Sequence, residues 1–155
     1  PVNFPTVKTG LKNWGNYANT VDAVIGCNTT IMNAFLKGRA AINNNDNAGR
    51  DEARNIVVKT WEKVAAAKFI AYVKIAKDNS GSQATFCHAL SEGVGFIEAF
   101  KYNSAKTISD ADIASLLSYF QTSGKVNLYK VTAPNLDAAI SKMASIFSID
   151  PALIP

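Results

Sequence analysis

A single long helical pattern decides the fold of this chain. It occupies residues 48–77, which read AGRDEARNIVVKTWEKVAAAKFIAYVKIAK. Its apolar side chains recur at steps of three and four residues and form one wide stripe: Val57, Trp61, Val64, Ala65, Phe69, Tyr72 and Ile75. Charged residues, including Arg50, Asp51 and Arg54, occupy the first turn and the other side. A helix of this length would span about 45 Å, which is typical of a helical bundle.

Four further helical patterns surround this stretch. One begins near Thr20, a good N-cap, and continues to about Ile42. Another covers residues 83–102, one follows the capping sequence at Ser109, and one begins near Pro134. Polar turns rich in Asn, Asp, Ser and Gly separate them, and no strand pattern competes. The sequence therefore predicts an all-α fold, a helical bundle of about five helices.

The N-terminal segment has a different character. Residues 1–19 contain two prolines, two glycines and several asparagines, so we expect an irregular N-terminal arm anchored by Phe4, Leu11, Trp14 and Tyr17. The helical bundle itself should cover residues 20–150. The sequence starts at Pro1 without a Met or an apolar signal segment, so we expect a processed product or a fragment.

Composition limits the function classes. Of the 155 residues, 48% are hydrophobic and 18% are charged, which indicates one globular, core-rich chain rather than a disordered one. The net charge of +4 comes from scattered lysines without an arginine cluster, so we expect no nucleic-acid partner. No apolar run approaches the roughly 20 residues of a membrane span, so we expect no such span.

The two cysteines, Cys27 and Cys87, lack the spacing of a zinc site or a CxxC motif. They would form one disulfide between two helices, which implies an oxidising compartment, or both would be small buried residues. The sequence leaves these two interpretations open.

The stretch Phe86-Cys87-His88-Ala89-Leu90-Ser91-Glu92 contains the residues that most resemble a chemical site. His88 is the only histidine, and Glu92 follows it by four residues, so a helix places both on one face. An imidazole beside a carboxylate suits metal binding or proton transfer. A metal needs further ligands, and the candidates on other helices are Asp22, Asp51, Glu52 and Glu62.

The face that carries His88 and Glu92 has two interpretations. It would be a solvated surface, or its small residues Ser91, Gly95 and Ala99 would let another helix approach, so that the pair lies between helices. There is no Gly-x-Ser-x-Gly elbow and no glycine loop that fits a phosphate.

Arg39 has two interpretations: it would pair with a buried carboxylate, or it would lie along the surface.

Five segments together resemble a known family. They are WGNY at 14–17, IMNAFLKGRAAI at 31–42, WEKV at 61–64, HALSEGVGFI at 88–97 and KYN at 101–103. In this order they resemble the C-terminal half of an uncharacterised family of bacterial cell-surface and periplasmic lipoproteins related to the imelysins. The resemblance implies an imelysin-like, exported helical bundle that forms half of a larger family unit. Its location would be periplasmic, cell-surface or secreted.

The first functional hypothesis is a non-catalytic extracytoplasmic module that binds a metal ion of the iron type, or a small ligand, between helices. His88 and Glu92 would be the metal ligands. The second is a structural or assembly module whose partner is another polypeptide, such as the missing N-terminal half. The third is an imelysin-like peptidase. Imelysins carry Gly-x-His-x-x-Glu, whereas this chain has His-x-x-x-Glu with Phe86 at the glycine position.

Overall fold

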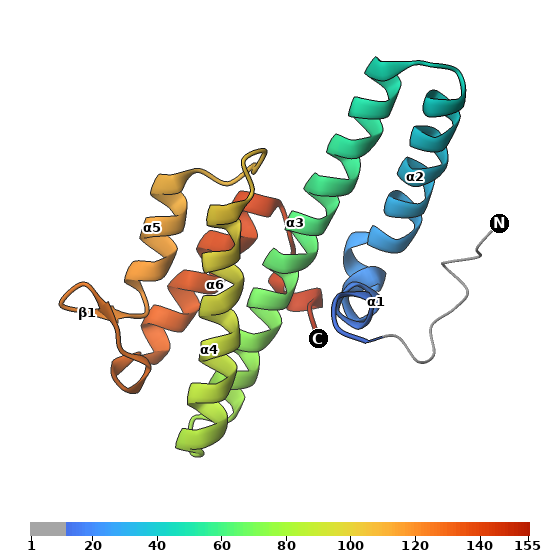
Figure 1. Cartoon of the computed structure of the whole chain (residues 1–155). Helices are drawn as coiled ribbons and strands as arrows, with labels where there is room; N and C mark the ends of the chain where they lie inside the picture. Colours follow the sequence, from blue (N-terminus) through green and yellow to red (C-terminus); the bar gives the residue numbers. More distant parts are fainter. Residues whose placement is uncertain (1–11) are drawn as a thin grey trace. The chain divides into compact units, whose positions relative to one another are not determined.

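The fold is all-α, as the sequence predicts. The computed structural model describes residues 12–155 (Figure 1). Within them, the α-helices are α1 (Trp14–Ile25), α2 (Cys27–Asn43), α3 (Asn47–Asp78), α4 (Gln83–Ala99), α5 (Asp110–Ser118) and α6 (Ala133–Phe147). Short elements connect or follow them: η2 (Phe100–Tyr102), β1 (Gln121–Thr122), β2 (Lys125–Val126), η3 (Leu128–Lys130) and η4 (Pro151–Leu153).

The chain divides into two compact units. Unit 1 is Pro1–Val64 and unit 2 is Ala65–Pro155. The boundary lies within α3, so the first part of this helix belongs to unit 1 and the second part to unit 2. The predicted bundle at residues 20–150 therefore includes parts of both units.

The predicted first helix is two helices in the structure. Helix α1 begins at Trp14, inside the segment expected to be irregular, and ends at Ile25, with Gly26 as its C-cap. Gly26 adopts a φ of 61°, a left-handed conformation that glycine reaches without steric cost, and its N–H donates to the carbonyl of Asp22 at 2.8 Å. This break explains why six α-helices occur where about five were expected. The rest of the predicted arm, with Phe4 and Leu11, lies outside the described residues.

Asp22 joins the end of α1 to the beginning of α2. Its carboxylate accepts a hydrogen bond from the backbone N–H of Asn28 at 2.7 Å. A negative charge at this place satisfies a free N–H group and is favourable at a helix N-terminus. The sharp turn at Gly26 is thus stabilised by a residue on the preceding helix.

Two tryptophans hold the helices of unit 1 together. The ring of Trp14 on α1 meets the ring of Trp61 on α3 edge to face, with centroids 5.9 Å apart. Trp14 also contacts Tyr17 at 5.8 Å. Edge-to-face pairs add to the stabilisation that comes from burial alone. Trp14, expected as an anchor of an irregular arm, is instead the first residue of α1 and is 46% exposed.

Helix α2 and the first part of α3 form an antiparallel hairpin in unit 1 (Figure 1). Residues 44–46 connect them, and the carboxylate of Asp46 accepts from the N–H of Gly49 at 2.9 Å. Small residues of both helices are buried in the hairpin, including Ala34, Ala41 and Ala53.

Aromatic side chains form the core of unit 2. Phe69 on α3 is fully buried and meets Phe120 edge to face at 6.1 Å. Phe100 stacks on Phe147 of α6 at 5.6 Å. Helix α4 approaches α3 at Gly93, where an added Cβ would lie 3.6 Å from Phe69. Phe69 of the predicted stripe thus belongs to the core of this unit, together with Ile70 and Val73, which lie outside the stripe.

Local signals at the helix starts of unit 2 agree with the sequence. The hydroxyl of Ser109 accepts from the N–H of Asp112 at 3.0 Å and caps α5. Thr132 and Asn135 form a capping box at α6. Between these two helices, β1 and β2 form a two-residue antiparallel pair.

Candidate functional site

Helix α4 carries the two residues that the sequence singles out. His88 is exposed and Glu92 is half-buried. The hydroxyl of Ser91 donates to the backbone carbonyl of His88 at 2.7 Å. The described part of the chain has no ion pair between the imidazole and the Glu92 carboxylate. The close helix approach occurs at Gly93, while Gly95 on the His88 face has nothing near its Cβ position.

The candidate ligands on other helices have structural roles. Asp22 caps α2, Asp51 pairs with Arg50 at 2.9 Å, and Glu52 pairs with Lys37 at 2.6 Å. Glu62 is buried. Among residues 12–155 there is no group of three or more His, Cys, Asp or Glu side chains that could hold a metal ion. Metal binding by His88 and Glu92 stays a prediction.

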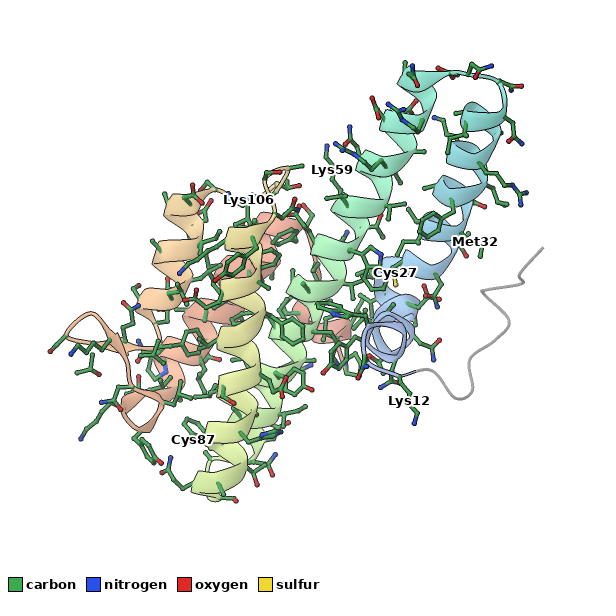
Figure 2. The ribbon with its side chains drawn as sticks, viewed as in Figure 1. Lys12, Cys27, Met32, Lys59, Cys87 and Lys106 are labelled. Atoms are coloured by element: carbon green, nitrogen blue, oxygen red, sulfur yellow. The ribbon has the colours of Figure 1, made fainter. Side chains whose placement is uncertain are left out.

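Both cysteines are free thiols (Figure 2). Cys27 is fully buried at the start of α2, and its thiol donates to the carbonyl of Ala18 at 3.3 Å. Burial, with the nearby charge of Asp22, raises the pKa of Cys27 to about 12. Cys87 on α4 is half-buried, and the side chain of Gln83 donates to its sulfur at 3.1 Å. Cys27 therefore behaves as a small buried residue.

The α2–α3 hairpin contains a groove that the sequence did not predict. We call it the hairpin groove, and its volume is about 400 Å³. Helix α2 lines it with Ala34, Phe35, Gly38, Arg39 and Ile42. Helix α3 lines it with Arg50, Ala53, Arg54, Val57 and Val58. All of these residues belong to unit 1, and each wall covers about two helical turns.

The floor and the edges of this groove differ in size and exposure. Ala34 and Ala53 are buried at the floor, and an added Cβ at Gly38 would lie 3.2 Å from the Cβ of Ala53. The helices are therefore close together there. Phe35 and Ile42 stand at the edge with 57% and 60% of their surfaces exposed. Large apolar side chains exposed above a floor of small ones are typical of a surface that receives another apolar group.

The charges that line the hairpin groove are all positive. Arg50 donates to Asp51 and to Asn47, both at 3.0 Å. Arg39 and Arg54 are exposed and have no ion pair within the described residues. Arg39 thus matches the surface interpretation, because it is exposed and pairs with no carboxylate among residues 12–155.

Unit 2 has smaller hollows of more mixed chemistry. One of about 270 Å³ is lined by Lys77, Tyr129 and Val131, among others. The ammonium group of Lys77 is already paired with Asp137. This hollow offers less apolar surface and a cation that is already neutralised.

The comparisons with known proteins give a family and no function. Residues 4–150 match a family described as a domain of unknown function, DUF4856, and the chain belongs to that family. No curated protein and no solved structure matches it. In the part of the chain that the structure describes, no helix is long and apolar enough to cross a membrane.

Proposed function

We propose that this chain is a non-catalytic helical module that binds an apolar helical segment of another polypeptide in the hairpin groove. The observation that carries the proposal is the exposure of Phe35 and Ile42 beside a closely packed floor of small residues. Water contact with such large apolar side chains is unfavourable, and a partner that covers them gains the corresponding free energy.

A helix is the partner shape that suits this groove. Each wall presents residues spaced like one face of a helix over two turns, about 12 Å in length. A third helix that lies between two antiparallel helices fills such a groove with side chains at steps of three and four residues.

The expected energy per anchor is modest. Burial of a whole isoleucine side chain is worth about 1.5–3 kcal/mol. Because 60% of Ile42 is exposed, its cover by a partner should contribute roughly 1–2 kcal/mol. Loss of this one contact should therefore weaken binding by about five- to thirtyfold.

The probe for this proposal is a stapled 14-residue helical peptide. Its leucines follow a three- and four-residue spacing, and all its other positions are uncharged glutamines. Titration calorimetry would measure its binding to the whole chain. We expect binding to the wild-type protein and a loss of at least fivefold in Ile42→Asp.

The matched control is Leu153→Asp, which alters another highly exposed apolar residue, in unit 2. It should bind the peptide like the wild type. No binding to the wild type at millimolar peptide, or equal effects of both substitutions, would refute the proposal. Circular dichroism of each variant checks that it folds.

The metal hypothesis remains a second proposal. Its support is the placement of His88 and Glu92 four residues apart on α4, with the imidazole accessible. Metal analysis of the purified protein beside His88→Ala tests it, and no bound metal in either would remove it. An extracytoplasmic bacterial location is proposed from the imelysin-type resemblance alone.

A further inference from the structure

We propose that the helix received by the hairpin groove is acidic, with carboxylates on both sides of its apolar stripe that pair with Arg39 and Arg54. This inference rests on the proposed function, because it specifies the chemistry of the same partner. The partner class is an amphipathic helix with Glu or Asp beside its leucine-like anchors.

The first support is the sign of the charge at the groove. Three arginines line it and no Asp or Glu does. Arg50 is neutralised by Asp51 at 2.9 Å. Arg39 and Arg54 have no carboxylate partner within residues 12–155, so two guanidinium groups remain for a ligand.

The second support is the position of these two guanidinium groups. Arg39 belongs to the α2 wall, directly after Gly38 of the floor. Arg54 belongs to the α3 wall, directly after Ala53 of the floor. A helix lying between the walls would therefore meet one arginine on each side of its apolar stripe. Guanidinium groups bind carboxylates with two parallel hydrogen bonds, so each pair also fixes the orientation of the bound helix.

A second copy of this chain fits the groove less well. Two copies of the groove face to face would bring arginines toward arginines, and like charges disfavour such contact. The nearby acidic residues that could compensate, Asp51 and Glu52, are already paired with Arg50 and Lys37. Charge complementarity thus favours a different, acidic polypeptide.

Three peptides test the inference. They share the apolar stripe of the probe above, and the four positions beside the stripe are all Glu, all Gln or all Lys. Calorimetry with the whole chain at low salt should give an order of affinity of Glu, then Gln, then Lys, with at least a fivefold gap between Glu and Lys. The gap should shrink at high salt, because exposed ion pairs are screened.

Two double variants locate the effect. Arg39→Gln with Arg54→Gln should lose the preference, so that the Glu and Gln peptides bind this variant with equal affinity. Lys12→Gln with Lys59→Gln is the matched control, because it removes the same charge from exposed positions of unit 1 that do not line the groove. It should keep the preference.

Each result decides one question. Equal binding of all three peptides, or the same loss in both double variants, would overturn the acidic partner and leave the proposed function standing. Absence of binding by every peptide would overturn both proposals. A concentration-dependent dimer that Ile42→Asp converts to a monomer would show that a second copy occupies the groove, and the inference would be wrong.

Discussion

Gly93→Ala should stabilise unit 2, although it adds a methyl group where α4 approaches α3. Alanine is favoured over glycine inside a helix by about 1 kcal/mol. The new Cβ would lie 3.6 Å from Phe69 and 3.6 Å from Val73, which is ordinary van der Waals contact. Burial of one methyl group adds about 0.8 kcal/mol, so the total gain should be about 1–2 kcal/mol.

Urea unfolding followed by far-ultraviolet circular dichroism measures this gain. With a denaturant slope of about 2 kcal/mol/M, the midpoint should rise by roughly 0.5–1 M. Gly95→Ala is the matched control, since its Cβ meets nothing within 4 Å and should gain only the helix propensity. The difference between the midpoints of the two variants measures what the contact with Phe69 and Val73 adds. A lower midpoint for Gly93→Ala beside a higher one for Gly95→Ala would refute the spacing of α3 and α4 described above.

Four further predictions concern single side chains. Iodoacetamide at pH 8 should label Cys87 and spare Cys27 in the folded protein, as mass analysis will show, because the pKa of Cys27 is about 12. Since this pKa exceeds the ordinary 9.0, stability should fall as pH rises from 9 to 12, and less so in Cys27→Ala, when urea midpoints are compared. Lys74→Met removes an ammonium group that donates to two backbone carbonyls near the C-terminus. It should therefore lower the free energy of unfolding by about 1–3 kcal/mol and speed carboxypeptidase digestion. Lys77→Met, which breaks an exposed ion pair, should do neither. The hydrogen bond from Lys142, with a second from a serine hydroxyl, lowers the pKa of Asp112. The stabilisation from these bonds should be present at neutral pH and lost in acid. Asp112→Asn should therefore show a smaller drop of the urea midpoint between pH 7 and pH 3 than the wild type.

The helical periodicity predicted the buried side of α3 only in part, because the buried Ile70, Val73 and Ala76 lie outside the predicted stripe. Val64 and Phe69 of its stripe are fully buried, although Ile75 is 40% exposed. Capping residues located the starts of α5 and α6 because side-chain hydrogen bonds to the first helical turn act locally. Local signals of this kind are readable without knowledge of the rest of the fold.

The break at Gly26 was not predictable with the same rules. A helix often continues through a single glycine, so Gly26 alone does not predict a break. The left-handed turn is stabilised here by the carboxylate of Asp22, which accepts from the N–H of Asn28. Phe35 and Ile42 continue the apolar periodicity of α2, yet both are exposed. It identifies apolar faces, but it does not tell whether another element covers them.

A signal for the groove was nevertheless present in α2. Its buried positions Ile31, Ala34 and Ala41 are followed by a second apolar row that includes Phe35 and Ile42. Together the rows form an arc wider than one neighbouring helix can cover. The exposed imidazole of His88 gave no corresponding signal, because its surroundings depend on which face of α4 turns inward.

The edge-to-face pair of Trp14 and Trp61 has a practical consequence for spectroscopy. The chain contains two tryptophans, and both belong to the N-terminal unit. Intrinsic fluorescence excited selectively at tryptophan therefore reports the unfolding of the N-terminal unit, because the C-terminal unit contains no tryptophan. A mismatch between emission and ellipticity curves would reveal that the two halves melt separately.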